Sequence, residues 1–401
     1  MRRLCLYLIL LALFALVPAL AFAETRIMVV SDIHYLAPSL YEGSGLFLRS
    51  MAVGDGKMTM ESPALVQALL AEARHQAPDV LLITGDLTFN GEKTSHEELA
   101  AAMDILWDEG IPVYVIPGNH DINNPNARAF IGDTYEAVPS VTPGEFHAVW
   151  DRCMLPAESV GDMSYTLRLN DEVWIAMTDV CVYEPAPEVY GFYSEDQQSW
   201  LLPMLAEARQ AGVTVICATH QSLIPRTSNK SYSIFNREYM LADLRSGGVT
   251  LNLSGHIHIQ SVMEQDGFTD ACTGAFSVYS HNYGIVTVGE DGVPRYERHA
   301  VCDEHLPEGF RERSAAAFDA NTRRSAEEQL RRLEIPEADR AAMVEFQVRL
   351  NRENFAGELD PSDPTWREDP GFALWREYAG NTTTGGYILR TLDFEGVTQE
   401  E

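Results

Sequence analysis

The chain alternates short apolar runs of the strand type with stretches of helical periodicity between about residues 26 and 300. Five of these runs are I-M-V-V at 27–30, V-L-L-I at 80–83, V-Y-V-I at 113–116, V-T-V-I-C at 213–217 and V-T-L-N-L at 249–253. Continuous apolar runs of this length are typical of strands that are buried on both faces. Helices are expected between them, over 62–73, 94–107 and 194–208, because each begins with Ser or Thr. The alternation predicts an α/β fold whose mostly parallel sheet is covered by helices on both sides.

The pattern changes twice toward the C-terminus. From Gly248 onward the apolar runs shorten and Gly turns become frequent, which predicts antiparallel strands that form a second sheet. Residues 305–401 are rich in Arg, Glu and Ala and have helical periodicity, with Met343, Phe346 and Leu350 on one stripe. We expect a helical C-terminal region that packs on the main domain.

The first 23 residues have the pattern of a signal peptide. Arg2 and Arg3 precede an apolar stretch over 4–21, and Ala21-Phe22-Ala23 provides a small-x-small cleavage site. Residues 1–23 are therefore expected to be removed during export, which predicts a secreted, periplasmic or cell-surface protein. An uncleaved anchor is the alternative, because the apolar stretch is nearly long enough to span a membrane. Contact with a membrane is expected only in that case.

The charge of the chain excludes one class of partner. The formal net charge is −30, and loss of Arg2 and Arg3 with the signal peptide would make it −32. Duplex nucleic acid binds proteins through Lys and Arg, so such an acidic surface repels it. Five cysteines would remain after cleavage, and their spacing fits no zinc motif. The pattern indicates neither their pairing nor the oligomeric state.

Polar motifs follow all five apolar runs. They are S-D-I-H at 31–34, G-D-L-T at 85–88, G-N-H-D at 118–121, T-H at 219–220 and G-H-I-H at 255–258. In an open α/β sheet, ligands bind beyond the carboxyl ends of the strands. Asp, Asn and His are ligand types that transition metals take, so one shared site for two metal ions is predicted.

These five motifs, in this order, resemble those of the calcineurin-like metallophosphoesterase family, over about residues 26–301. The resemblance implies a four-layer αββα sandwich of two mixed sheets, with a metallophosphoesterase domain at 24–304 and the helical region after it. It also implies a pair of divalent or trivalent transition-metal ions; manganese, iron and zinc all suit such ligands. By motif position, one ion would be held by Asp32, His34, Asp86 and His258, and the other by Asp86, Asn119, His220 and His256.

The same resemblance implies hydrolysis of a phosphoester by in-line attack of a hydroxide held between the two ions. Asp86 is the expected bridge, because one carboxylate can reach two cations. His120 is expected to protonate the leaving oxygen, and Asp121 to orient the His120 imidazole. Asn90 and Glu92 are further candidates for contact with the substrate.

Three further residues lie at strand ends without a motif position. Asp179 is expected to support the site from behind the ligands, and His281 and Tyr283 are candidates for lining it. Two long segments, 35–61 and 221–247, leave from ligand-bearing strand ends. Because structured loops of this length are usually functional, we expect them to determine specificity.

The motif G-D-L-T followed by N-G-E, together with G-N-H-D, resembles the bacterial cyclic-nucleotide phosphodiesterase branch of the family. The expected substrate is therefore a small phosphodiester, and in particular a cyclic nucleotide. A broad phosphomonoesterase or nucleotidase with the same two metals is the alternative enzyme. A binding module that keeps the fold without catalysis is the alternative from a different class.

Overall fold

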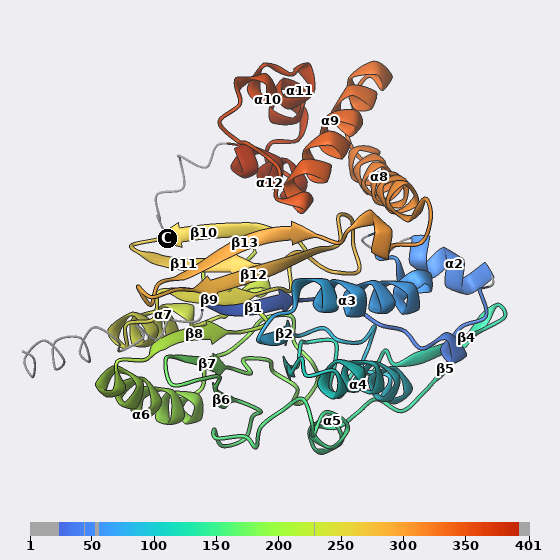
Figure 1. Ribbon diagram of the computed structural model, residues 1–401. Helices are drawn as coiled ribbons and strands as arrows, with labels where there is room; N and C mark the ends of the chain where they lie inside the picture. The colour runs from blue at the N-terminus through green and yellow to red at the C-terminus, as the bar shows by residue number, and fades with distance from the viewer. Residues whose placement is uncertain (1–23, 44, 53–55, 228, 393–401) are drawn as a thin grey trace, which may run out of the picture.

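Two β-sheets lie at the centre of the computed structural model, which describes residues 24–43, 45–52, 56–227 and 229–392 (Figure 1). The first sheet has the order β13-β12-β1-β2-β3: Pro294–Ala300, Asn282–Val288, Thr25–Val30, Val80–Thr84 and Val113–Ile116. The second has the order β10-β11-β9-β8-β7-β6: Ser261–Gln265, Phe268–Cys272, Leu251–Ser254, Thr214–Ala218, Val173–Met177 and Tyr165–Arg168. A separate hairpin joins β4 and β5, Arg128–Ile131 and Thr134–Ala137.

Both sheets are mixed. In the first, β1, β2 and β3 are parallel, whereas β12 and β13 extend the sheet with antiparallel pairing. In the second, β11, β9, β8 and β7 are parallel, and β10 and β6 are antiparallel edges. The expectation that the strands after Gly248 form a second sheet of their own is wrong. They divide between the two sheets, because β12 hydrogen-bonds along β1 whereas β9 and β11 continue from β8.

Alternate residues of β7 show how the sheets and helices are layered. Val173, Ile175 and Met177 belong to the main apolar core, to which both sheets contribute, whereas Trp174 and Ala176 pack with the helices on the other face. Successive side chains of a strand point to opposite faces, so β7 lies between the two layers. The predicted fold of two mixed sheets flanked by helices is confirmed.

The helices of this part of the chain are α2 (Gly45–Ala52), α3 (Ser62–Gln76), α4 (Lys93–Asp108), α5 (Pro143–Val149), α6 (Glu195–Ala211) and α7 (Arg237–Ser246). Short 3-10 turns are η1 (Pro38–Leu40), η2 (Thr59–Glu61), η3 (Lys230–Tyr232) and η4 (Asp303–His305). Helix α6 begins where the sequence predicts, because the Ser194 hydroxyl and the Gln197 side chain form a capping box.

The C-terminal helices have a small core of their own. They are α8 (Phe310–Leu330), α9 (Glu337–Ala356), α10 (Pro364–Glu368), α11 (Pro370–Ala379) and α12 (Thr383–Leu392), and they gather on one side of the sheets (Figure 1). Met343, Phe346 and Leu350 pack into this core with Trp375, so the stripe faces other C-terminal helices rather than the main domain. Contact with the main domain comes instead from Phe318, which packs with Ala275 and Val278, and from nearby residues.

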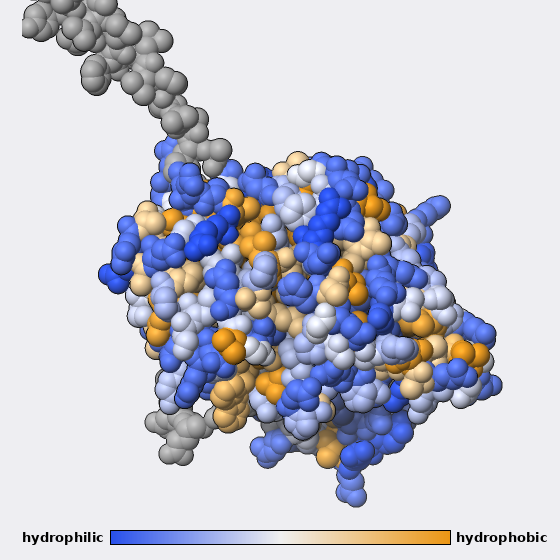
Figure 2. Space-filling view, turned by 90° about the horizontal axis from the view of Figure 1, so that it is seen from below, coloured by the Kyte–Doolittle hydropathy of each residue, from blue (hydrophilic) through white to orange (hydrophobic). Residues whose placement is uncertain are grey.

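Hydrophilic residues dominate the face of the molecule in Figure 2, and apolar ones form scattered small groups, as the large negative charge suggests. The predicted signal peptide, residues 1–23, lies outside the described residues. Among the helices of the described residues, none combines the length and apolar character that a membrane span requires.

A buried carboxylate joins α3 to the segment that leads into α8. Glu72 accepts hydrogen bonds from the backbone N–H of Cys302, from Tyr283 Oη at 3.0 Å and from His305 Nδ1 at 2.9 Å. Burial opposes the charge of Glu72, but the Cys302 N–H and the other donors outweigh it and lower the pKa of the carboxyl group. The ionised form therefore stabilises the folded protein.

We expect Glu72→Ala to lower the free energy of unfolding by about 3 kcal/mol, because buried donors lose a charged acceptor. Urea unfolding followed by circular dichroism measures the change. For Glu72→Gln, the difference from the wild type should be present above the ordinary pKa of 4.5 and disappear as the pH falls through the lower folded-state pKa. Asp171→Ala, at an exposed position, is the control. Equal stability of Glu72→Ala and wild type would contradict the role of this carboxylate.

Candidate metal centre

The five predicted motifs begin at the carboxyl ends of β1, β2, β3, β8 and β9, with Pro117 between β3 and its motif. The carboxyl ends of these strands come from both sheets and meet in one place, so side chains between positions 32 and 258 become neighbours. Two groups of possible ligands form there, and their ligand atoms lie within 4.8 Å of one another. The first group is Asp32, His34, Asp86 and His258, and the second is Asp86, His220 and His256.

Five of these residues have left-handed backbone conformations, with φ of 56° at Asp32, 47° at His34, 50° at Asp86, 72° at His256 and 61° at His258. Such conformations are rare outside glycine and cost about 1–2 kcal/mol each. Hydrogen bonds hold two of them, from Asp32 N to Gly85 O and from His34 N to Asp86 O, each 3.0 Å long. The strained turns bend the chain at the strand ends, where the ligands are needed.

Two glycines allow the motifs to approach one another. Gly85 has a φ of 97°, and a Cβ atom at this position would lie 2.5 Å from His220 Nδ1. A Cβ atom on Gly118 would overlap the backbone N and the Oδ1 atom of Asp86. Any larger residue at either position would therefore push the G-D-L-T motif away from the side chains opposite it.

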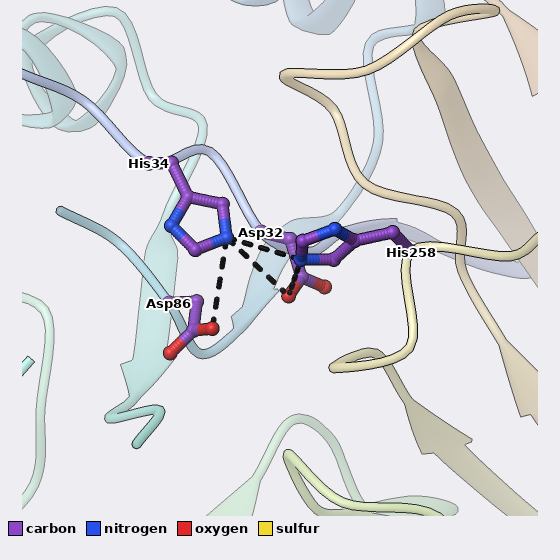
Figure 3. A group of neighbouring side chains, drawn as sticks. All are labelled: Asp32, His34, Asp86 and His258. Atoms are coloured by element: carbon purple, nitrogen blue, oxygen red, sulfur yellow. Dashed lines mark hydrogen bonds and ion pairs between the residues drawn. The ribbon is translucent and has the colours of Figure 1, made fainter. Parts of the chain in front are cut away.

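The first group forms a compact set in which His34 Nε2 faces the other three residues (Figure 3). His34 Nε2 lies 3.1 Å from His258 Nε2 and 3.6 Å from Asp86 Oδ2, and His258 Nε2 lies 3.4 Å from Asp32 Oδ1. Two nitrogen ligands about 2.1 Å from one ion lie roughly 3.0–3.4 Å apart at common coordination angles. The spacing of the two imidazoles is therefore suitable for a shared cation.

The second group lies on the other side of Asp86. His220 Nε2 is 3.4 Å from Asp86 Oδ1 and 3.2 Å from the amide oxygen of Asn119, which brings the predicted Asn119 to this group. Asp86 thus presents one oxygen to His34 and the other to His220. This is the arrangement that a carboxylate bridging two cations requires.

Buried atoms without partners support a metal site. Among the described residues, neither ring nitrogen of His256 has a hydrogen-bond partner. An unpaired buried polar atom is costly, so a side chain with two of them is expected to have a ligand. The donor set of carboxylate, imidazole and amide groups fits transition-metal ions.

Charges within the centre are set by burial and by the two carboxylates. Burial lowers the pKa of His256 to about 3 and that of His34 well below its usual value, so both rings are neutral and able to bind a cation. Burial alone would raise the pKa of Asp86, but His220 and His120 outweigh it and hold it well below the usual range. Burial opposes protonation of His220, yet Asp86 raises its pKa to about 9. Metal binding there would displace a proton.

The Thr84 carbonyl orients one ligand, which the sequence did not reveal. His220 Nδ1 lies 2.8 Å from Thr84 O, so Nδ1–H donates and Nε2 faces Asp86 and Asn119. Metal-binding histidines commonly have such a partner on the other ring nitrogen. Backbone carbonyls are present at every residue, so no sequence pattern could have indicated this one.

The expected contact between Asp121 and the His120 ring is wrong. His120 Nδ1 is 2.9 Å from Phe89 O and 3.1 Å from Asn90 Oδ1, so these groups orient the imidazole. Asn90, a candidate for substrate contact, thus has a defined place beside His120.

Asp121 instead holds two motifs together. Its carboxylate accepts hydrogen bonds from the backbone N–H groups of Leu87, Thr88 and Gly118, at 3.1, 2.9 and 2.8 Å. Burial and the charge of Asp86 raise its pKa to about 7. Three backbone N–H groups, two of them in the G-D-L-T motif, hold the Asp121 carboxylate. The ring of the neighbouring His120 is therefore not its partner.

The remaining candidates lie outside the two ligand groups. Asp179 is buried and accepts a hydrogen bond from Tyr183 Oη at 2.6 Å. Glu92 accepts from Asn90 N, which supports the loop beside His120. His281 contacts Phe276 O and Ser314 Oγ, both at 2.8 Å, and Tyr283 contacts Glu72, so neither is placed in the ligand groups.

Known proteins are similar to parts of this chain. A relative named "Probable cyclic nucleotide phosphodiesterase", from Vesicomyosocius okutanii, is 38% identical over 65 residues, which are 16% of this chain and 27% of that protein. The match thus spans little more than a quarter of that relative's length. A UDP-2,3-diacylglucosamine hydrolase from Sodalis glossinidius is 22% identical over 260 residues, 62% of this chain and 98% of that protein.

A solved structure of a dimetal phosphatase from Danio rerio covers 69% of this chain with 99% of its own, at a TM-score of 0.50 and 14% identity. This likeness concerns the fold alone. The family model described as "Calcineurin-like phosphoesterase" matches residues 25–260, which include all five motifs and both ligand groups. The match covers more than half of the sequence, and the chain therefore belongs to the calcineurin-like phosphoesterase family.

Proposed function

We propose that the protein is a phosphodiesterase that depends on two transition-metal ions and hydrolyses small phosphodiesters, cyclic nucleotides among them. The observation that carries the proposal is the sharing of Asp86 between the two ligand groups. The proposed ligands are Asp32, His34, Asp86, Asn119, His220, His256 and His258. The two complete ligand groups, with His120 beside them, speak against a binding module without catalysis.

The bound cations would supply Lewis acidity toward the phosphoryl oxygens and lower the pKa of water. The chain itself contributes His120, whose Nδ1 is held by Phe89 O and Asn90 Oδ1. Nε2 is then the ring atom left for the substrate, and in the protonated ring it can donate to a leaving oxygen. His120 N also donates to Asp86 Oδ1 at 2.9 Å, so the proposed acid and the proposed bridge are held in fixed positions relative to each other.

The substrate class is supported by similarity and by motifs. Both curated relatives have a nucleotide in the name of their substrate, a cyclic nucleotide in one case and a UDP derivative in the other. The N-terminal pattern Arg2-Arg3 to Ala23 supports export, so the proposed substrates are phosphodiesters met outside the cytoplasm.

We expect the purified wild type to contain about two transition-metal ions per chain. Asp86→Ala should lose metal, and its turnover should be at least about 1,000-fold lower. Metal analysis and phosphodiester hydrolysis measure the two effects. Removal of the ions by a chelator should abolish the activity, and addition of Mn²⁺, Fe²⁺ or Zn²⁺ should restore it. Asp171→Ala, on an exposed turn, is the matched control. Full activity of Asp86→Ala would refute the bridging role.

For His120→Ala we expect the metal content of the wild type but a turnover about 100- to 10,000-fold lower, as is usual for loss of a general acid. His75→Ala, at an exposed position on α3, serves as the control and should behave as the wild type. Loss of metal in His120→Ala would instead make His120 part of the ligand set.

Bis(p-nitrophenyl) phosphate and p-nitrophenyl phosphate have the same leaving group and differ in the second ester bond. The proposal predicts a higher kcat/KM for the diester than for the monoester. It also predicts that the protein hydrolyses 2′,3′- or 3′,5′-cyclic nucleotides. A preference for the monoester would favour the phosphomonoesterase alternative. If the metal-loaded protein cleaved neither compound, it would be a binding module.

A further inference from the structure

Exposed aromatic side chains are concentrated in two segments of the chain. Of the five well-exposed aromatic residues in the described ranges, Tyr135 lies on the β4–β5 hairpin, whereas Phe192, Tyr232, Phe235 and Tyr239 lie between positions 192 and 239. Single exposed apolar residues are ordinary on protein surfaces, but a concentration of aromatic rings usually marks a binding site. Phe235 is 62% exposed and Tyr232 43%, so both rings offer a face to solvent.

Backbone hydrogen bonds hold the chain around Gly191 against residues 233–235. Gly191 N donates to Ser233 O at 3.2 Å, and Phe235 N donates to Gly191 O at 2.7 Å. As a result, the rings of Tyr190 and Phe235 lie 6.0 Å apart at an angle of 54°. We call Tyr190, Tyr232 and Phe235 the aromatic wall. Their main-chain anchors make the wall part of the folded structure.

One ring of the aromatic wall lies beside the metal centre. The Tyr232 ring lies 5.8 Å from the ring of His256, which in turn lies 5.0 Å from the ring of His220. Both histidines belong to the second ligand group. The wall therefore begins one ring away from the cation site that contains Asn119, on the side of His256.

We propose that the aromatic wall stacks the nucleobase of a nucleotide substrate whose phosphate group lies at the metal centre. This inference rests on the proposed function and specifies its substrate. A nucleotide has an anionic group at one end and a flat aromatic ring at the other, separated by one sugar. The site presents the matching sequence of surfaces: cation ligands, the His256 ring, and then exposed aromatic faces.

The chemistry of the wall favours a base over an alkyl chain. Stacking on open aromatic faces suits every nucleobase, because each base has a π-face. A long alkyl chain would instead require an enclosed aliphatic channel to leave water, whereas Tyr232 and Phe235 are exposed. The wall also explains why the segment 221–247 is long, since it carries both rings to this position.

Competitive inhibition separates the contribution of the base from that of the phosphate. Hydrolysis of ethyl p-nitrophenyl phosphate is the reporter, and adenosine 5′-monophosphate, ribose 5-phosphate and octyl phosphate are the inhibitors. The first two differ only in the base. We expect the wild type to bind adenosine 5′-monophosphate about 5- to 100-fold more tightly than ribose 5-phosphate, from the usual strength of base stacking.

In Tyr232→Ala and Phe235→Ala this advantage should fall toward one, while the inhibition constant of ribose 5-phosphate changes little. Tyr232→Phe should keep the advantage, because the aromatic face remains. Tyr135→Ala removes an equally exposed ring far along the chain, on β5, and should leave both the reporter turnover and the advantage unchanged.

Equal inhibition by adenosine 5′-monophosphate and ribose 5-phosphate in the wild type would overturn the inference. So would an advantage that survives in both alanine variants, or tighter binding of octyl phosphate than of the nucleotide. Absence of reporter hydrolysis by the metal-loaded wild type would contradict the proposed function instead. Calorimetric titration of the same three compounds would then still test the wall.

Discussion

The shared position of one carboxylate constrains the rest of the structure. Asp86 follows β2 in the first sheet, and its two oxygens face His34 on one side and His220, which follows β8 in the second sheet, on the other. Both ligand groups therefore form only when the two sheets have this relative position. The apolar core between them, with residues such as Val29, Ile83 and Ile216, sets that position. Packing far from the ligands thus determines whether both groups form.

Much of the site could be predicted from the sequence because its signals are local. An apolar run followed within three residues by Asp, Asn or His marks a strand end with a ligand, and all five such ends meet in the structure. Pairing between strands is not local, which is why the division of β9 to β13 between two sheets was missed. Nor does sequence proximity indicate direction: Asp121 is next to His120 but binds backbone N–H groups of the G-D-L-T loop.

The left-handed conformations of the ligands show where local preference yields to the site. Asp32, His34, Asp86, His256 and His258 all have a φ that disfavours residues with side chains. Asp and His adopt this conformation more readily than most other residues, although glycine remains the usual choice. The hydrogen bonds across the motifs, together with close packing at Gly85 and Gly118, maintain it here. The folded scaffold thus holds the ligands in place before any cation binds, so little ordering of the chain would accompany binding.

The contact of Phe318 with the main domain has a mechanical consequence. Besides Ala275 and Val278, this ring in α8 meets Gly56, where a Cβ atom would lie 3.2 Å from its Cδ2 atom. Two residues later Met58 N donates to Ser277 O, and Ser277 Oγ donates to Asp32 O at 2.9 Å. The C-terminal helices thus support the first motif through three successive contacts, although none of the ligands in the two groups comes from them. A change in the C-terminal helices that removed the Phe318 contact would therefore make the position of Asp32 less well defined.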